Sequence, residues 1–402
     1  MEIQDYIEKK KALQKKLIDY LDSYDNIEEK YQNFLEEYKQ QKISEDRYEL
    51  EEFLQLIMAI SDYHHRLPNF FSKIYNILAI LKPIIQNHFT NHEIFTILEQ
   101  NKLVLLYAIE NKMITIDSFI TTKLSGYIHK KELYTNYFFN EIKEFIQDEK
   151  LKKLIEYENS INPKNFEENR KIGENDEYIC QLIRGDKIEE FISYVSRNSI
   201  SLKTIIEKSI FETNKFILKK YSCHSINTNL IEYAAFFGSS QIFKYLYLNG
   251  AELTSSVWDY AVYGDDEEII HILENEKVPL NTYILYSTYR ESIKSHHIHI
   301  TNYLLDNLDN DEAKKEKLKN DFYLRRIQEL NDYPGFNALE CYTNIPSFEY
   351  HNYYFFPKKL DDPFNFGYLC MYNYINLVSL LLKTKKINVN QKIISKNILL
   401  ME

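Results

Sequence analysis

The chain has 402 residues with a formal net charge of −11 at pH 7, and it contains only 8 glycines and 8 prolines. So few turn-forming residues argue against an all-β sandwich and against a nucleotide-binding fold with glycine-lined phosphate loops. The negative charge argues against binding to nucleic acids or to anionic membrane surfaces, because both need net basic charge on the binding face. Hydrophobic residues make up 44% of the chain, enough for a folded core, and we expect an all-α protein.

The first 62 residues carry apolar side chains at three- and four-residue steps, a spacing typical of amphipathic helices. Asp25-Asn26 and Ser44 interrupt this pattern. The interruptions predict three helices, although a coiled coil is an alternative interpretation. Further along, Asn91 is a candidate N-cap for a helix over residues 93–100. We therefore expect residues 1–169 to form a helical N-terminal module.

From about residue 170 the sequence repeats with a period of 26. Gly238 and Gly264 are 26 positions apart, and each separates two short apolar stretches. One period before Gly238 lies Glu212, and two periods before it lies Asp186. The next turn after Gly264 is expected at His296. A fixed period that carries two short helices is the signature of a repeat array.

Residues 230–253, LIEYAAFFGSSQIFKYLYLNGAEL, are similar to the ankyrin consensus in their paired alanines, their inter-helix glycine and their loop Asn249-Gly250-Ala251. Over roughly residues 1–307 the chain resembles the large ankyrin-repeat families of parabasalid protists such as trichomonads, whose domains have no assigned function. The stretches that carry this wider resemblance are residues 91–102, 137–142, 173–183, 209–216 and 232–239.

The chain departs from the ordinary ankyrin pattern in two respects. Thr228-Asn229-Leu230-Ile231 stands where the family has a T-P-L-H tetrapeptide, and the period is 26 rather than 33. Compared with the ankyrin pattern, the shorter period implies that the β-hairpin fingers between the repeats are shortened. It also implies that the face of the shorter helices, rather than the fingers, is the contact surface.

The pattern is lost over residues 308–362, where charged residues and prolines predict an irregular insertion or linker. It resumes over residues 363–402 with Asn373 at the glycine position. This last segment is expected to be an ankyrin-like repeat, either capped by its own final helix or truncated. The predicted fold is all-α: the helical module of residues 1–169, then an ankyrin-like helical-hairpin solenoid with shortened fingers over residues 170–307.

The motifs of common catalytic sites are missing from the sequence. There is no phosphate loop, dinucleotide fingerprint or nucleophile elbow, and Thr96 stands where a zinc-protease helix would need its second histidine. His296, His297 and His299 are one and two positions apart, so they point in different directions on a helix and make a poor metal site. We expect no enzymatic activity, no cofactor, no metal and no small-molecule substrate.

The four cysteines are scattered, with no C-x-x-C pair. This distribution is typical of reduced thiols in a cytoplasmic protein. The N-terminus lacks the apolar core of a signal peptide, and the longest apolar stretch is too short to span a membrane. We therefore expect a cytoplasmic location.

Aromatic side chains gather around the first helices of two neighbouring repeats. Such residues anchor many protein interfaces, although they also fill the core between the helices of a solenoid. The sequence predicts a non-catalytic scaffold or adaptor that binds an unidentified protein partner; alternatives are a self-assembling structural protein or a truncated family copy without a partner. The candidate contact residues are Phe236, Phe237, Trp258, Tyr260, Tyr263 and Asp265.

Overall fold

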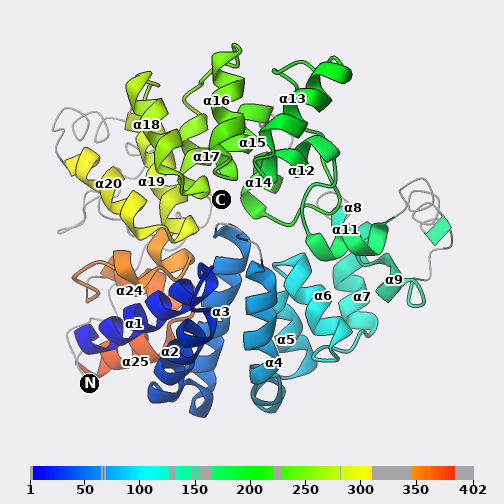
Figure 1. The fold of residues 1–402 in the computed structure, drawn as a ribbon. Coiled ribbons are helices and arrows are strands. Elements are labelled where there is room, and N and C mark those ends of the chain that lie inside the picture. Colours follow the sequence, from blue (N-terminus) through cyan, green and yellow to red (C-terminus); the bar gives the residue numbers. More distant parts are fainter. Residues whose placement is uncertain are drawn as a thin grey trace. The chain divides into compact units, whose positions relative to one another are not determined.

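The computed structural model describes residues 3–64, 67, 69–125, 132–146, 149, 152–153, 165–220, 228–280, 282–309, 346–361 and 363–384. Within these ranges the regular elements are helices (Figure 1), and an isolated bridge joins Ile205 to Asn229. The described part of the protein is all-α, as predicted. Most of the predicted insertion 308–362, and the end of the chain after residue 384, lie outside the described residues.

The chain forms two compact units. Unit 1 comprises residues 1–60 and 279–402, and unit 2 comprises residues 61–278. The sequence-based boundaries near residues 170, 308 and 363 do not coincide with these divisions and stay predictions.

Unit 1 joins the first helices of the chain to its last ones. In it, α1 packs against α2 and against α25, while α19 packs on α20 and α24 on α25. The three N-terminal helices are those that the apolar spacing predicts. The helices of unit 1 are α1 (Ile3–Leu21), α2 (Ile27–Gln40), most of α3 (Arg47–Tyr63), α19 (Thr282–Ser295), α20 (Ile298–Asp309), α24 (Pro363–Met371) and α25 (Ile375–Lys383).

Unit 2 is a succession of shorter helices. Its first part contains α4 (Phe70–His88), α5 (Asn91–Leu98), α6 (Lys102–Glu110), α7 (Ser118–Ser125), α8 (Glu132–Tyr137), α9 (Phe139–Ile142) and α11 (Phe166–Ile172). Its second part contains α12 (Tyr178–Arg184), α13 (Ile188–Arg197), α14 (Lys215–Lys220), α15 (Leu230–Phe236), α16 (Ser240–Leu248), α17 (Val257–Gly264) and α18 (Glu267–Asn275).

The N-cap of α5 is Thr90 and not the predicted Asn91. The Thr90 hydroxyl accepts from the Glu93 N–H, and the Glu93 carboxylate accepts in return from the Thr90 N–H. This reciprocal capping box satisfies two backbone donors that a helix start otherwise leaves unpaired. The Asn91 side chain instead donates to the carbonyl of Thr115 and accepts from its N–H.

Three helical hairpins of unit 2 stack side by side (Figure 1): α12–α13, α15–α16 and α17–α18. The first helices of neighbouring hairpins contact each other, and so do the second helices. The turns of the first two hairpins, at Asp186 and Gly238, are two periods apart in sequence although the hairpins are neighbours in space. Glu212, the position one period before Gly238, does not lie at a hairpin turn. Residues 199–214 form no helix, so α14 has no partner helix directly before it in the sequence.

The second and third hairpins touch backbone to backbone at two glycines. A Cβ atom on Gly264 would lie 2.0 Å from the carbonyl oxygen of Ala235, and one on Gly238 would lie 2.5 Å from the carbonyl oxygen of Gly264. Gly238 also has a left-handed backbone with φ of 62°. In the next hairpin the left-handed residue is Asp265, with φ of 52°. The two glycines thus share a 26-residue spacing but have different local roles.

We expect Gly264→Ala to destabilise the protein by about 3 kcal/mol, because its methyl group meets main-chain atoms that cannot rotate away. The measurement is urea-induced unfolding of the full chain, followed by circular dichroism. Gly250→Ala is the control: a Cβ there meets nothing within 4 Å although φ is 90°, so the cost is only the left-handed backbone, about 1 kcal/mol. Equal losses in the two variants would contradict the close-approach argument.

Candidate protein-interaction surface

Three hairpin turns share one backbone pattern built around a left-handed residue. At Gly238, its N–H donates to the carbonyl of Ala235, the next N–H donates to Ala234, and the N–H after that returns to Gly238. The turns at Asp186 and at Asn373, between α24 and α25, repeat these three bonds. Asn373 thus has the same left-handed backbone as Gly238, because asparagine tolerates this conformation better than most residues.

Polar side chains join the first hairpin to the second at this row of turns. The Asp186 carboxylate accepts from the N–H groups of Gln241 and Ile242, at 3.1 and 2.9 Å. These two donors belong to the first turn of α16, which has no side-chain cap of its own at Ser239. The Ser239 hydroxyl donates instead to the carbonyl of Ile183, at 2.5 Å. Each hairpin thus supplies the hydrogen-bond partners that the other lacks.

Four of the six candidate contact residues are core side chains: Phe236, Trp258, Tyr260 and Tyr263 are each at most 4% exposed. The rings of three of them surround Phe216 of α14, with centroids at 4.5 to 5.8 Å. The Trp258 indole N–H donates to the carbonyl of Val278. This burial gives the four side chains a packing role, and it leaves Phe237 and Asp265 as the candidates nearest to solvent.

Phe237 is half-buried at the turn after α15. Its ring contacts those of Tyr233 and Phe236, and the Arg184 guanidinium lies 5.9 Å from its centroid. Asp265 is exposed at the next turn, and the neighbouring Asp266 caps α18 by accepting from the Ile269 N–H. Asp266, Glu267 and Glu268 therefore begin α18.

The first helices of the second and third hairpins, α15 and α17, do not provide the surface that the resemblance implies, whereas α12 of the first hairpin exposes Tyr178. Every side chain of α15 and of α17 is buried. Solvent reaches the second helices instead, where Leu248 is 77% exposed. We define the outer surface as the exposed side chains of α13, α16 and α18. Its members are Glu189, Glu190, Ser196, Arg197, Gln241, Leu248, Glu267, Glu268, His271, Glu274 and Asn275.

A partly buried polar cluster joins α12 to α15. The Arg184 guanidinium pairs with Glu174 at 2.6 Å and donates to the Asn175 carbonyl and to the Tyr233 hydroxyl. Burial raises the pKa of the Tyr233 hydroxyl and that of the neighbouring Cys180 thiol. A thiol held in its protonated form is a poor nucleophile, so the cluster is suited to holding α12 against α15 rather than to covalent chemistry.

The histidines singled out in the sequence do not gather into a metal centre. His296 occupies the predicted turn between α19 and α20, with φ of 62°, and its Nδ1 lies 3.1 Å from the side chain of Gln14. His271 pairs with Glu274 on the surface of α18. Among the described residues, no three His, Cys, Asp or Glu side chains lie close enough together to hold a metal ion.

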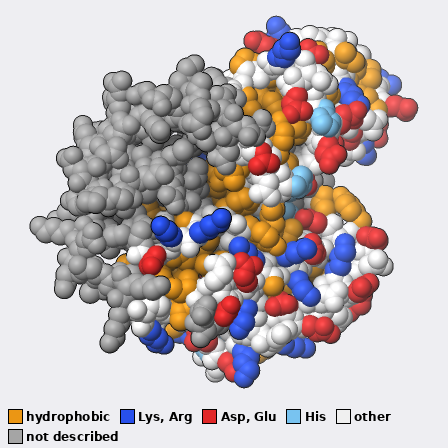
Figure 2. Space-filling model, turned by 90° about the vertical axis from the view of Figure 1, so that its left-hand side faces the viewer, with side chains coloured by type: hydrophobic (Ala, Val, Ile, Leu, Met, Phe, Trp, Pro, Cys, Tyr) orange, Lys and Arg blue, Asp and Glu red, His pale blue; other side chains and the backbone are white. Residues whose placement is uncertain are grey.

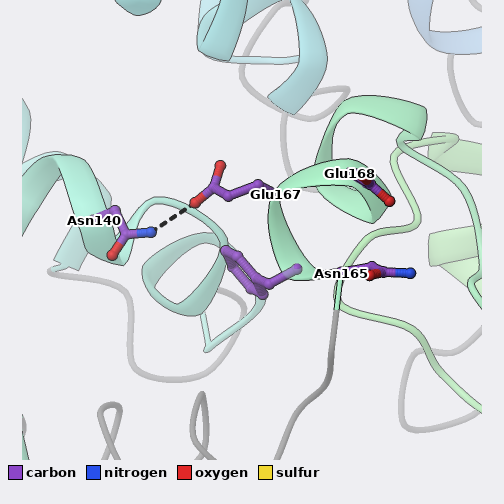
Figure 3. A pocket seen from close by; sticks show the side chains of 5 residues that line it. Asn140, Asn165, Glu167 and Glu168 are labelled. Carbon is purple, nitrogen blue, oxygen red and sulfur yellow. Dashed lines mark hydrogen bonds between the residues drawn. The ribbon is translucent and has the colours of Figure 1, made fainter.

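A surface depression of about 430 Å³ lies between α9 and α11 (Figure 3). The Asn140 amide donates to Glu167 across it, at 2.8 Å. The Glu167 carboxylate also pairs with the buried Arg170, so its charge is already compensated. The lining residues are Asn140, Asn165, Phe166, Glu167 and Glu168.

On the face drawn in Figure 2, Lys and Arg side chains are interspersed with Asp and Glu. Among the described side chains of that face, no continuous basic patch of the kind that contacts to a phosphate backbone require is seen.

In the described ranges, no helix combines the length and the apolar composition that crossing a membrane requires.

Comparison of the chain with protein families, with curated proteins and with solved structures finds no match.

We expect Asp186→Gly to destabilise the protein by about 1 kcal/mol, because the first turn of α16 loses its carboxylate acceptor while glycine tolerates the left-handed backbone. Asp186→Ala loses the same acceptor and adds the left-handed penalty, for a total of about 2 kcal/mol. Denaturant unfolding of both variants measures the two contributions. Wild-type stability in Asp186→Gly would show that the carboxylate does not stabilise α16.

Proposed function

We propose that the chain is a non-catalytic scaffold or adaptor that binds a protein partner through the outer surface. The observation that supports this proposal is the stack of three hairpins, in which α15 and α17 are buried and all three second helices expose side chains to solvent. Stacked helical hairpins offer extended, rigid surfaces of the kind that repeat proteins use to bind partners. The shared turn pattern and the buried alanine pair of α15 support an ankyrin-like array with shortened fingers as the architecture.

The chemistry of the outer surface is suited to a protein interface. Leu248 offers an apolar contact, while Glu189, Glu267 and Glu274 are exposed acids on α13 and α18. Apolar contacts at the centre of an interface supply most of the affinity, and surrounding charges direct partner choice. Phe237 and Asp265 stay candidate contacts at the edge of this surface.

The test compares two variants with the same change in charge. The outer-surface variant carries Leu248→Lys and Glu274→Lys, and the control carries Tyr24→Lys and Glu36→Lys on unit 1; all four wild-type side chains are exposed. Affinity capture from cytosol, followed by titration of the captured protein, measures binding. We expect the outer-surface variant to bind at least about tenfold more weakly, a loss typical of one disrupted anchor, and the control to bind like the wild type.

Circular dichroism and thermal unfolding establish that both variants are folded. Equal binding by the two variants and the wild type would place the contact elsewhere, and equal loss would indicate dependence on net charge alone. Either result contradicts the proposal. If no partner is captured and sedimentation velocity shows concentration-dependent association, the self-assembling structural protein becomes the better interpretation.

A further inference from the structure

Residues 346–361 dock on helices near the other end of the chain through buried polar contacts. The Tyr353 N–H donates to the Gln14 side chain at 2.9 Å, and Gln14 donates to the Asn352 side chain at 3.0 Å. The Tyr353 hydroxyl donates to the Glu52 carboxylate at 2.5 Å. All four of these side chains are buried within unit 1. The docked state therefore depends on hydrogen bonds that water would otherwise satisfy.

Glu52 is the centre of these contacts. Its carboxylate accepts from the hydroxyls of Tyr353 and Tyr6, and it lies 3.6 Å from the ammonium group of Lys10, which also pairs with Glu49. Burial raises the pKa of Glu52, and the charge of Lys10 opposes that rise. One carboxylate thus holds α1, α3 and the docked segment together.

His351 belongs to the same segment and is buried in an environment that disfavours a positive charge. It is 5% exposed, and its ring packs 4.9 Å from the ring of Tyr374. Its Nδ1 atom has no hydrogen-bond partner. Burial, together with the charge of Lys10, lowers the pKa of His351 to about 3. The carboxylates of Glu49 and Glu52 are engaged by Lys10 and by tyrosine hydroxyls, and no described carboxylate forms a hydrogen bond to the His351 ring.

We propose that residues 346–361 form an acid-labile latch, in which protonation of His351 releases the segment from α1 and α3. An imidazolium in the docked state would be dehydrated, unpaired and close to Lys10, whereas in the released state water would solvate it. Protons therefore bind the released state more readily. The docked state keeps its full stability above the ordinary histidine pKa of about 6.5 and loses stability as the pH falls towards about 3.

Glu52 acts in the opposite direction. Because its pKa in the docked state is raised, that state takes up a proton at Glu52 more readily than the released state does. Acid then strengthens docking through this carboxylate. Variants at His351 and at Glu52 consequently separate the two contributions.

The test is hydrogen exchange of the full chain at pH 7 and pH 5, read by mass spectrometry in peptides that cover residues 346–361 and corrected for intrinsic exchange rates. We expect the opening equilibrium of this segment to rise about twentyfold between the two pH values. His351→Phe keeps an aromatic ring without a titrating group and should remove this rise. The matched control, His271→Phe, changes an exposed histidine and should behave like the wild type.

Two further variants keep the test decisive. If His351→Phe does not dock at pH 7, then His351→Gln, which is neutral and polar, takes its place. Glu52→Gln should retain the acid-induced opening or enlarge it. The proposal is overturned by pH-independent exchange in the wild type, by the same opening in the docked His351 variant, or by loss of the opening in Glu52→Gln, which would make the carboxylate the sensor.

Discussion

The close backbone approach at Gly238 and Gly264 determines how tightly the second and third hairpins can stack. With no Cβ atom at either position, the carbonyl of Gly264 and the turn after α15 come within the distance that a side chain would occupy. The first helices then lie so close together that α15 and α17 are buried along their whole length. The aromatic rings around Phe216 fill the space that remains beside these helices, and this close packing leaves the second helices as the solvent side of the stack.

The same geometry divides the polar groups of the stack into two sets. Asp186 and Ser239 join neighbouring hairpins, because the first turn of a helix leaves N–H groups that need acceptors and a buried hydroxyl needs a partner. Of the acids on α13 and α18, Glu268 pairs with Lys244 of α16, whereas Glu189, Glu267 and Glu274 take no part in the contacts of Asp186 and Ser239 and are exposed. A surface that can bind a partner without disturbing the core is therefore separate from the residues that build the core.

Unit 1 is held together by a different physical principle. Its first helices and residues 346–361 are brought together by contacts between sequence positions 301 and 339 apart. Such contacts require a long loop closure, which must be compensated by the bonds that form afterwards. Several of these bonds involve buried charges. The desolvation penalty of a buried ion pair offsets much of the attraction between its charges. Docking that balances large opposing contributions is sensitive to the gain of a single proton.

The amino-acid sequence by itself determined the helices and many of their turns, because apolar spacing, capping residues and turn residues such as Gly238 and Asn373 act over a few neighbouring positions. It did not determine burial. The sequence positions of Tyr260 and Tyr263 are compatible with contact to a partner and with burial in the core. Only the packing of α14, α15 and α17 shows that both rings are buried against Phe216. The absence of a helix directly before α14 was also visible only in the tertiary structure. The same holds for the polar contacts around Glu52 and His351, because these contacts join residues far apart in the sequence.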